Sequence, residues 1–250
     1  MTSTVSEAPA GQPPHTRSLG TVLVTGAASG LGRATARAVA IAGGQPLLLD
    51  RGDAHTHAGP DLAAAPAAVV DLADTRAAEE AVTALAEQAG GLDAVVTAAG
   101  TDRCGRLADV PGEEWETVVR VNLLGTAAVC RAALPFLTRS RGRIVTVAST
   151  LATRALPDAS AYCASKFGVL GLSRALAAEM QGEVGVTTLL PGGMDTAFFD
   201  GRDAQYRPGP DAMLNDPGAV AAAVVFALTR PDGCEVRELV VTPSVEPSWP

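Results

Sequence analysis

Tyr162 and Lys166 form the pair of residues best suited to acid–base chemistry in this sequence. They lie four positions apart in Tyr-Cys-Ala-Ser-Lys, a spacing that places both side chains on one face of a helix. A free phenol has a pKa of about 10, too high for a base at neutral pH. A cation about 4 Å away contributes about 4 kcal/mol at an effective dielectric constant of about 20, which lowers a phenol pKa by up to about 3. The pair therefore predicts a tyrosine activated by a lysine.

The composition of the chain strengthens this interpretation. Among 250 residues there are 18 arginines but only one lysine, Lys166, and one of the two tyrosines stands beside it. Arginine presents a wide, permanently charged fork, whereas lysine presents a compact point charge. A single lysine in such an arginine-rich chain indicates a position that arginine cannot fill. The alternative is a tyrosine and a lysine that merely decorate a helix surface.

A glycine-rich turn predicts a phosphate-binding site near the N-terminus. The segment Thr25–Gly32 follows an apolar run and precedes an alanine-rich helix pattern. Glycines let the backbone approach a pyrophosphate, and a helix N-terminus offers free N–H groups. The spacing is G-x3-G-x-G, and its position in the first strand–helix unit favours dinucleotide binding over a purely structural turn. The candidate contacts are Gly26, Ser29, Gly30, Leu31 and Gly32.

Asp50, at the end of the next apolar run, bears on the choice of dinucleotide. An acidic residue here accepts hydrogen bonds from the ribose hydroxyls of NAD and repels the 2′-phosphate of NADP. Arg51 follows directly and has the charge to pair with that phosphate. The balance favours NAD, with NADP as the alternative.

Strand and helix patterns alternate along the chain. Short apolar runs without polar alternation are typical of buried parallel strands, and longer amphipathic or alanine-rich runs of helices. Asp74 is a candidate N-cap. The predicted strands are 21–25, 46–50, 67–71, 93–97, 143–149, 184–190 and 238–242; the predicted helices are 31–42, 74–89, 111–134 (ending near Pro135), 160–181 and 219–228.

This order predicts an α/β fold, a doubly wound parallel sheet of the Rossmann type in a single domain. Residues 19–242 form the dinucleotide-binding and catalytic domain, preceded by a flexible N-terminal arm at 1–18 and followed by a C-terminal tail at 243–250. The irregular stretch 195–217 is long for a compact domain and is expected to be a substrate lid.

Charge and composition exclude several classes of function. The net charge of −8 leaves no basic footprint for nucleic acid. We find no apolar stretch of about 18 residues that would predict a membrane span, and the N-terminus lacks the features of a signal peptide. None of the four cysteines is in a Cys-x-x-Cys pair, which favours free thiols in a reducing cytoplasm. His55 and His57 have no further ligand cluster nearby, so we expect no metal site.

These motifs together resemble the short-chain dehydrogenase/reductase family over nearly all of residues 19–242. The turn TGAASGLG resembles the family's TGxxxGxG, and YCASK its YxxxK. The matches to the remaining family positions are Ser149 as the catalytic serine, Asn122 as the helix asparagine, Asp71-Leu72 against the adenine, Ala98, Ala99 and Gly100 beside the cofactor, and Pro191-Gly192 with Thr196 over the nicotinamide.

The resemblance implies a role for each member of this group. Tyr162 exchanges a proton with the substrate oxygen, while Ser149 hydrogen-bonds the same oxygen and stabilises its developing charge. Lys166 binds the cofactor ribose and lowers the tyrosine pKa. Asn122 holds a water that links Lys166 to solvent. The family also implies a homo-oligomer, a tetramer or dimer, paired through the two long helices.

Two departures from the family pattern stand out. The family's NNAG is Thr97-Ala98-Ala99-Gly100 here, so both amides are absent, and the C-terminus lacks the frequent Asp-Gly-Gly ending. The tail is therefore expected to follow a different path, one possibility being a subunit contact. Arg103 and Arg154 are charged exceptions in an otherwise apolar predicted pocket, placed either to clamp an anion or to point into solvent.

The predicted function is hydride transfer between a nicotinamide cofactor and a secondary alcohol or ketone, a small and largely apolar molecule. An NADPH-dependent ketoreductase is the alternative within the same class. A non-catalytic dinucleotide-binding sensor or scaffold is the alternative of another class. It is disfavoured because such proteins usually lose the tyrosine or lysine that this chain keeps.

Overall fold

The computed structural model describes residues 16–56 and 59–249. Seven strands form one sheet in the order β3-β2-β1-β4-β5-β6-β7, with every neighbouring pair parallel. The strands are β1 Thr21–Thr25, β2 Gln45–Asp50, β3 Ala67–Val69, β4 Ala94–Thr97, β5 Arg143–Val147, β6 Gly185–Pro191 and β7 Glu238–Val241. The predicted single-domain α/β sheet of the Rossmann type is confirmed.

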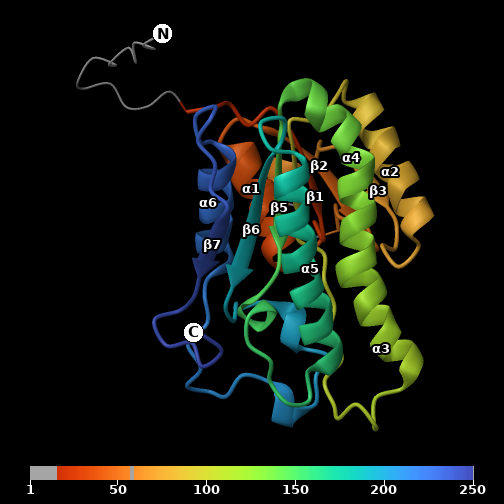
Figure 1. Ribbon diagram of the computed structural model, residues 1–250, viewed down its shortest axis with the longest axis vertical. Helices are drawn as coiled ribbons and strands as arrows, with labels where there is room; N and C mark the ends of the chain where they lie inside the picture. Colours follow the sequence, from red (N-terminus) through yellow and green to blue (C-terminus); the bar gives the residue numbers. More distant parts are fainter. Residues whose placement is uncertain (1–15, 57–58, 250) are drawn as a thin grey trace.

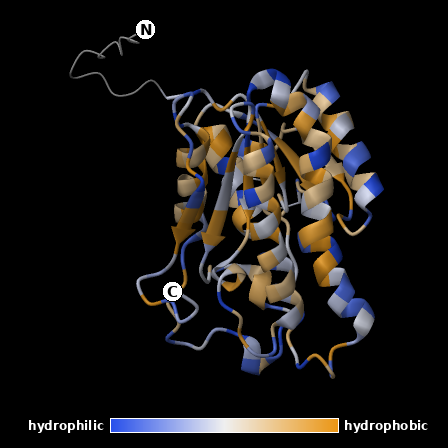
Figure 2. Cartoon of the chain, in the orientation of Figure 1, coloured by the Kyte–Doolittle hydropathy of each residue, from blue (hydrophilic) through white to orange (hydrophobic). Residues whose placement is uncertain are grey.

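Helices cover both faces of the sheet (Figure 1). The helices are α1 Gly30–Ile41, α2 Thr75–Gln88, α3 Gly112–Val119, α4 Thr126–Ser140, α5 Ser160–Glu179 and α6 Pro217–Leu228. One core cluster joins α1 and α6 to the sheet, and a second joins α2, α4 and α5 to the opposite face. In β1, Val22 and Val24 face the first cluster and Leu23 the second, which explains why the strands are apolar without alternation (Figure 2).

The strand order reverses between β1 and β4, which defines a crevice at the carboxyl edge of the sheet. The right-handed connections leave α1 and α6 on one face of the sheet and α2, α4 and α5 on the opposite face. The loops that follow the strands, residues 195–217 and the C-terminal end of the chain all gather at that end of the molecule (Figure 1). The fold therefore brings residues from separate strands to one edge.

The helix predicted to end near Pro135 instead continues through it to Ser140. Pro135 is exposed, so the helix hydrogen bond that proline cannot donate is lost on the side that faces solvent. Leu137, two residues later, is fully buried and holds the last turn against the core. The same helix has a π-helical turn at Arg120–Gly125, between α3 and α4. Neither feature follows from the apolar periodicity.

The run Gly112–Ser140 is one continuous helix, long and apolar enough by length and composition to cross a membrane. This differs from the prediction that the sequence has no apolar stretch of about 18 residues. Nearly half of its most apolar window is buried inside the protein, and Val129, Ala133 and Leu137 belong to the core cluster. It is a buried core helix rather than a span.

Most other predicted boundaries agree within about two residues. The Asp74 carboxylate accepts hydrogen bonds from the Arg76 and Ala77 backbone N–H groups at 3.1 Å each, which confirms the predicted N-cap. The stretch 195–217 contains two short 3-10 turns, Ala197–Phe199 and Ala204–Tyr206. Residues 1–15 of the predicted arm, and His57, lie outside the described residues.

Candidate active site

A cavity of about 1060 Å³ opens at the carboxyl edge of the sheet. The predicted site residues that line it are Ser29, Gly30, Leu31, Arg51, Gly100, Ser149, Tyr162, Lys166, Pro191, Gly192 and Thr196. Those not among its lining residues are Gly26, Gly32, Asp50, Asp71, Leu72, Ala98, Ala99 and Asn122. The fold thus brings the glycine turn, the Tyr-Lys pair and the Pro-Gly segment to a single cavity, although they are up to 167 positions apart (Ser29 to Thr196).

Ser149 and Tyr162 meet at one end of this cavity. Ser149 follows β5, and Tyr162 lies in the first turn of α5. Both side chains line the cavity, and the Ser149 hydroxyl is near enough to the phenol to affect its ionisation. Burial raises the pKa of Tyr162 to about 12, while the Ser149 hydroxyl lowers it and so works in the opposite direction. The phenol is therefore a proton donor at neutral pH in the free protein.

Lys166 lies one helical turn after Tyr162 and is buried. Its ammonium is 5.6 Å from the centre of the Tyr162 ring and donates a hydrogen bond to the Val147 carbonyl oxygen at 2.8 Å. Burial lowers the pKa of Lys166 to about 8, and the Asp102 carboxylate opposes that shift. In the free protein burial is the largest influence on the phenol, so the lowering of the tyrosine pKa by the lysine stays a prediction.

Asn122 lies in the π-helical turn and is fully buried. Its Oδ1 accepts a hydrogen bond from the Thr101 N–H at 2.8 Å, and its Nδ2 donates to the Thr101 carbonyl at 2.9 Å and to Ser165 Oγ at 3.0 Å. The side chain therefore braces the loop after β4 against α5. A water held by Asn122 stays a prediction.

The glycine turn packs closely on the end of β4. Gly26 has a φ of +70°, and a Cβ there would lie 2.8 Å from the Ala99 Cα, so glycine is required on both counts. The Ala99 N–H donates to Thr25 Oγ1 at 3.0 Å, which joins β1 to the end of β4 without the amides of the family's NNAG motif. The Thr97 hydroxyl, which replaces one of these amides, is buried with no hydrogen-bond partner in the described part of the chain.

The acidic residues of the predicted cofactor site lie at the ends of β2 and β3. The Asp50 carboxylate accepts hydrogen bonds from the Ala28 N–H of the glycine turn at 2.9 Å and from the Gly52 N–H at 3.0 Å. Arg51 is exposed and lines the cavity. Asp71 is exposed and its carboxylate accepts from the Ala73 N–H at 2.9 Å, whereas Leu72 is buried.

These residues fit a dinucleotide. The α1 N-terminus opens onto the cavity at Ser29, Gly30 and Leu31, with no acidic residue in its first turn to repel a phosphate. In the described part of the chain Lys166 has one hydrogen-bond acceptor, so two of its three N–H groups remain for ribose hydroxyls. No cluster of three or more metal-ligating side chains occurs within residues 16–56 and 59–249.

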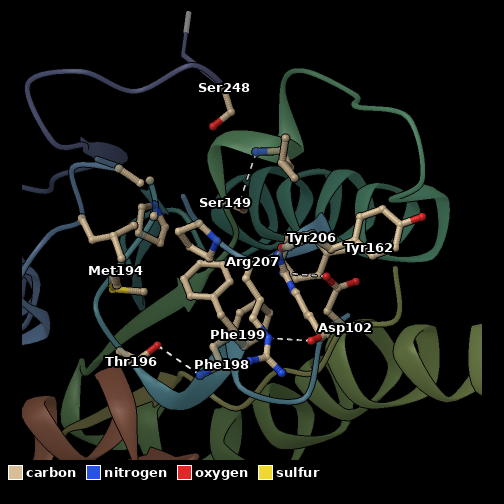
Figure 3. A pocket seen from close by; sticks show the side chains of 18 of the residues that line it. Asp102, Ser149, Tyr162, Met194, Thr196, Phe198, Phe199, Tyr206, Arg207 and Ser248 are labelled. Atoms are coloured by element: carbon tan, nitrogen blue, oxygen red, sulfur yellow. Dashed lines mark hydrogen bonds and ion pairs between the residues drawn. The ribbon is translucent and has the colours of Figure 1, made fainter. Parts of the chain in front are cut away.

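The predicted lid contributes a charged contact that the sequence did not reveal. Arg202 donates to the Asp102 carboxylate with an Nη2–Oδ2 distance of 2.6 Å, and this pair is largely buried, with 19% and 5% of the side chains exposed. The guanidinium also stacks on the rings of Phe198 and Phe199, at 5.0 and 4.6 Å from their centres. Phe198 in turn lies 5.8 Å from the Tyr162 ring, so the lid residues reach the catalytic end of the cavity (Figure 3).

Neither of the arginines singled out from the sequence presents an open anion clamp. Arg103 forms an ion pair with Glu114, and both side chains are about half exposed. Arg154 is exposed and donates to the Pro247 carbonyl at 3.1 Å, so it holds the C-terminal tail. The tail itself lines the cavity of its own chain through Val245, Glu246, Pro247 and Ser248. Spacing along the sequence gave no signal for Asp102, Arg202 or Glu246, because their partners are far away in the chain.

Comparison with known proteins agrees with this geometry. The family model for short chain dehydrogenases matches residues 20–207. A D-threitol dehydrogenase from Mycolicibacterium smegmatis is 37% identical over 217 residues, covering 82% of this chain and 84% of the relative.

Two solved structures are also similar. One is a short chain dehydrogenase from Burkholderia cenocepacia in complex with NADP, 31% identical with a TM-score of 0.77 over 88% of this chain and 95% of the other. Another is an actinorhodin polyketide ketoreductase with NADPH, 27% identical with a TM-score of 0.79 over 89% and 95%. This chain belongs to the short-chain dehydrogenase/reductase family and is an NAD(P)-dependent oxidoreductase.

Proposed function

We propose that this enzyme transfers hydride between a nicotinamide cofactor and a neutral secondary alcohol or ketone. The observation that carries the proposal is that Ser149 and Tyr162 line the same cavity, with the buried Lys166 ammonium 5.6 Å from the centre of the Tyr162 ring. The nicotinamide supplies or accepts the hydride when it is bound. In the reductive direction Tyr162 Oη gives its proton to the substrate oxygen while the Ser149 hydroxyl donates a hydrogen bond to the same oxygen.

The surroundings of Tyr162 favour a neutral substrate. Asp102 and Arg202 neutralise each other in one pair, and Arg103 is engaged by Glu114. Much of the remaining wall is apolar and includes Leu151, Leu156, Met194, Phe198, Phe199, Met213, Leu214 and Val245. Arg207 also lines the cavity and donates to the Arg202 and Asp200 carbonyls, at 2.7 and 2.9 Å. An apolar alcohol or ketone would bury its surface against the apolar wall.

We propose NAD as the cofactor and NADP as the second candidate. The Asp50 carboxylate, at the end of β2, would repel the 2′-phosphate of NADP. The second candidate, an NADPH-dependent ketoreductase, is favoured by Arg51, which lines the cavity, and by the cofactors named with the two similar structures. Gly26, Ser29, Gly30, Leu31 and Gly32 would hold the pyrophosphate, and Pro191, Gly192 and Thr196 the nicotinamide, as the family resemblance implies.

A substrate panel with both cofactors tests the proposal. The panel contains an apolar cyclic alcohol and its ketone, a small polyol such as threitol, and a 2-keto acid, followed by NAD(P)H absorbance. We expect the highest kcat/KM for the neutral apolar pair with NAD(H), and no turnover above background for Tyr162→Phe. A higher kcat/KM for the keto acid would overturn the neutral substrate. Preference for threitol would instead align this enzyme with its D-threitol dehydrogenase relative.

We further propose that the enzyme acts in the cytoplasm as a homotetramer or dimer without nucleic-acid or membrane partners. Cys104, Cys130, Cys163 and Cys234 are all free thiols. The net charge of −8 disfavours binding to nucleic acid or to an anionic membrane surface. Exposed apolar side chains on α5 and α6, including Phe167 and Phe226, support self-association.

A further inference from the structure

The C-terminal tail, residues 243–249, folds back over the cavity instead of leaving the domain. Four consecutive residues, Val245 to Ser248, line the cavity wall. Figure 3 shows Ser248 in the upper part of the view, above Ser149. The tail therefore contacts the cavity of its own chain, and a subunit contact is not required to explain its path.

Glu246 is the central residue of this tail. Its Oε2 accepts a hydrogen bond from the Gly193 N–H at 2.9 Å, within the Pro191–Thr196 segment. Its Oε1 accepts from the Ser248 N–H at 3.0 Å and from Ser248 Oγ at 2.6 Å. Both carboxylate oxygens thus accept hydrogen bonds, one from the Pro191–Thr196 segment and the other from the tail itself.

The chain of hydrogen bonds continues from Ser248 to Thr150, the residue after Ser149. Ser248 Oγ and Thr150 Oγ1 are 2.6 Å apart, and both residues are buried. Thr150 directly follows Ser149, whose own Oγ accepts from the Leu151 N–H at 3.1 Å and caps the 3-10 turn Thr150–Ala152. A chain of hydrogen bonds therefore runs from Gly193 through Glu246, Ser248 and Thr150 to the residue beside Ser149.

The shape of the Pro191–Thr196 segment fits this carboxylate. A Cβ on Gly192 would lie 2.3 Å from Glu246 Oε2, so only glycine admits the carboxylate at this distance. The Gly192 N–H donates to the Val241 carbonyl at 2.9 Å, which fixes the segment to the end of β7 just before the tail begins. Gly192 thus leaves room for the Glu246 carboxylate, and its bond to Val241 fixes the segment beside the start of the tail.

We propose that Glu246 is a positioning residue, which holds the Pro191–Thr196 segment at a fixed separation from the Ser149–Thr150 turn. The inference rests on the proposed function, in which the first segment carries the nicotinamide and the second polarises the substrate oxygen. Hydride transfer is sensitive to the distance between these two partners, and a misplacement of about 1 Å costs on the order of 10²-fold in rate. A carboxylate suits the role because it accepts from both sides at once.

The test compares Glu246→Gln and Glu246→Ala with Ser244→Ala, an exposed tail position that does not line the cavity. Glutamine keeps the size, but its NH2 group can only face one of the two donors, so one link is lost. We expect kcat to fall about tenfold for Glu246→Gln and on the order of 10²-fold for Glu246→Ala. KM for the alcohol should change less than threefold, and Ser244→Ala should behave as wild type.

Amide hydrogen exchange of the protein without cofactor provides a readout independent of turnover. The Gly193 amide should exchange at least tenfold faster in Glu246→Ala, because its acceptor is gone, and remain protected in Ser244→Ala. Equal protection of Gly193 in all variants would overturn the proposal, as would a kcat within twofold of wild type for both Glu246 variants.

Two further measurements keep this result interpretable. If Glu246→Ala does not fold, the fall in kcat of Glu246→Gln and Ser248→Ala decides, since both variants preserve most of the tail and Ser248→Ala keeps the bond between Gly193 and Glu246. Failure of the proposed function itself has a different signature: Tyr162→Phe would then retain activity. The Gly193 exchange result would still stand in that case, because it is measured on the protein alone.

Discussion

Lys166 is the residue whose charge the proposed chemistry most requires, and burial acts against that charge. Its pKa of about 8 means that the ammonium is charged below that pH and neutral above it. We therefore expect kcat/KM for the cofactor, which reports ionisations of the free enzyme, to fall as the pH rises above about 8. A pH–rate profile from 6 to 10 measures this.

Lys166→Arg is the matched control for the pH profile. Arginine stays charged throughout this range, so the fall above pH 8 should disappear. The overall rate should nevertheless be low, because the wide fork does not fit the space of the compact ammonium. A wild-type profile that stays flat to pH 10, or wild-type rates in Lys166→Arg, would contradict the assigned role.

Tyr162→Phe isolates the proton-transfer oxygen. The variant keeps the ring that packs against Phe198, so the dissociation constant of the cofactor should change less than threefold. The loss of general acid catalysis should lower kcat about 10²- to 10⁴-fold. Steady-state kinetics together with cofactor titration measures both effects, and a kcat within tenfold of wild type would exclude Tyr162 as the acid.

Asp50→Ala tests the choice of cofactor. Removal of the carboxylate relieves its repulsion of a 2′-phosphate, while Arg51 remains to pair with it. We expect the ratio of kcat/KM for NAD(H) to that for NADP(H) to fall at least tenfold. Asp71→Ala, which changes an exposed carboxylate at the end of β3, serves as a comparison. A wild-type enzyme that already prefers NADPH would show that Arg51 dominates over Asp50.

At the residue scale, the sequence could predict contacts only between side chains that are close together along the chain. Tyr162 and Lys166 are one helical turn apart, so their proximity follows from spacing alone. Asp102 and Arg202 are 100 positions apart, and their ion pair exists only because the loop after β4 and the lid meet over the cavity. The partial burial of Tyr162, which raises its pKa, is likewise a property of the folded pocket.

At the element scale, the segment 195–217, which is the predicted lid, depends on Arg202 for its contacts with the rest of the chain. This side chain binds Asp102, contacts the rings of Phe198 and Phe199, and donates to the Tyr206 carbonyl at 3.3 Å. It therefore connects both 3-10 turns of the lid to the loop after β4.

Arg202→Met should loosen the predicted lid and remove the charged partner of the Asp102 carboxylate, which would keep only the Arg103 N–H and the Cys104 thiol as donors. Loss of a partner by a buried charged group costs about 1–3 kcal/mol, so the free energy of unfolding should fall by about that amount, and KM for the alcohol should rise several-fold. Urea denaturation and steady-state kinetics measure the two effects. Adding Asp102→Asn should restore part of the stability. The exposed Arg106→Met is the control, and equal effects of the two single variants would remove the special role of Arg202.

The positions of most helices and strands could be predicted because local patterns decide them: apolar runs for strands, and N-caps such as Asp74 for helix starts. The helix through Pro135 and the π-helical turn at Arg120–Gly125 could not. Both depend on tertiary packing, which overrides the local preference of a single residue. The same holds for the tail, whose path is set by Glu246 and Ser248 finding partners in other elements.

At the scale of the whole molecule, two sets of exposed apolar side chains lie on different elements. One comprises Leu124 and Phe167, on the helix pair that the family resemblance predicts to associate, each with nearly half of its surface exposed. The other comprises Phe226 on α6 and Val240 on β7. A closed tetramer with two-fold axes needs two different self-complementary surfaces, whereas a dimer needs one.

We therefore expect the enzyme to sediment at about four times its chain mass of 25.2 kDa at micromolar concentration. Phe167→Arg should disrupt the first surface and Phe226→Arg the second, because a charge buried in an apolar contact is unfavourable. Each single variant should then sediment as a dimer and the double variant as a monomer, with the circular dichroism spectrum unchanged. Val69→Arg changes an exposed valine on the edge strand β3, outside both surfaces, and should leave the tetramer intact. A wild-type protein that sediments at 25 kDa would refute the assembly, and a dimer insensitive to Phe167→Arg would assign the contact to α6 and β7.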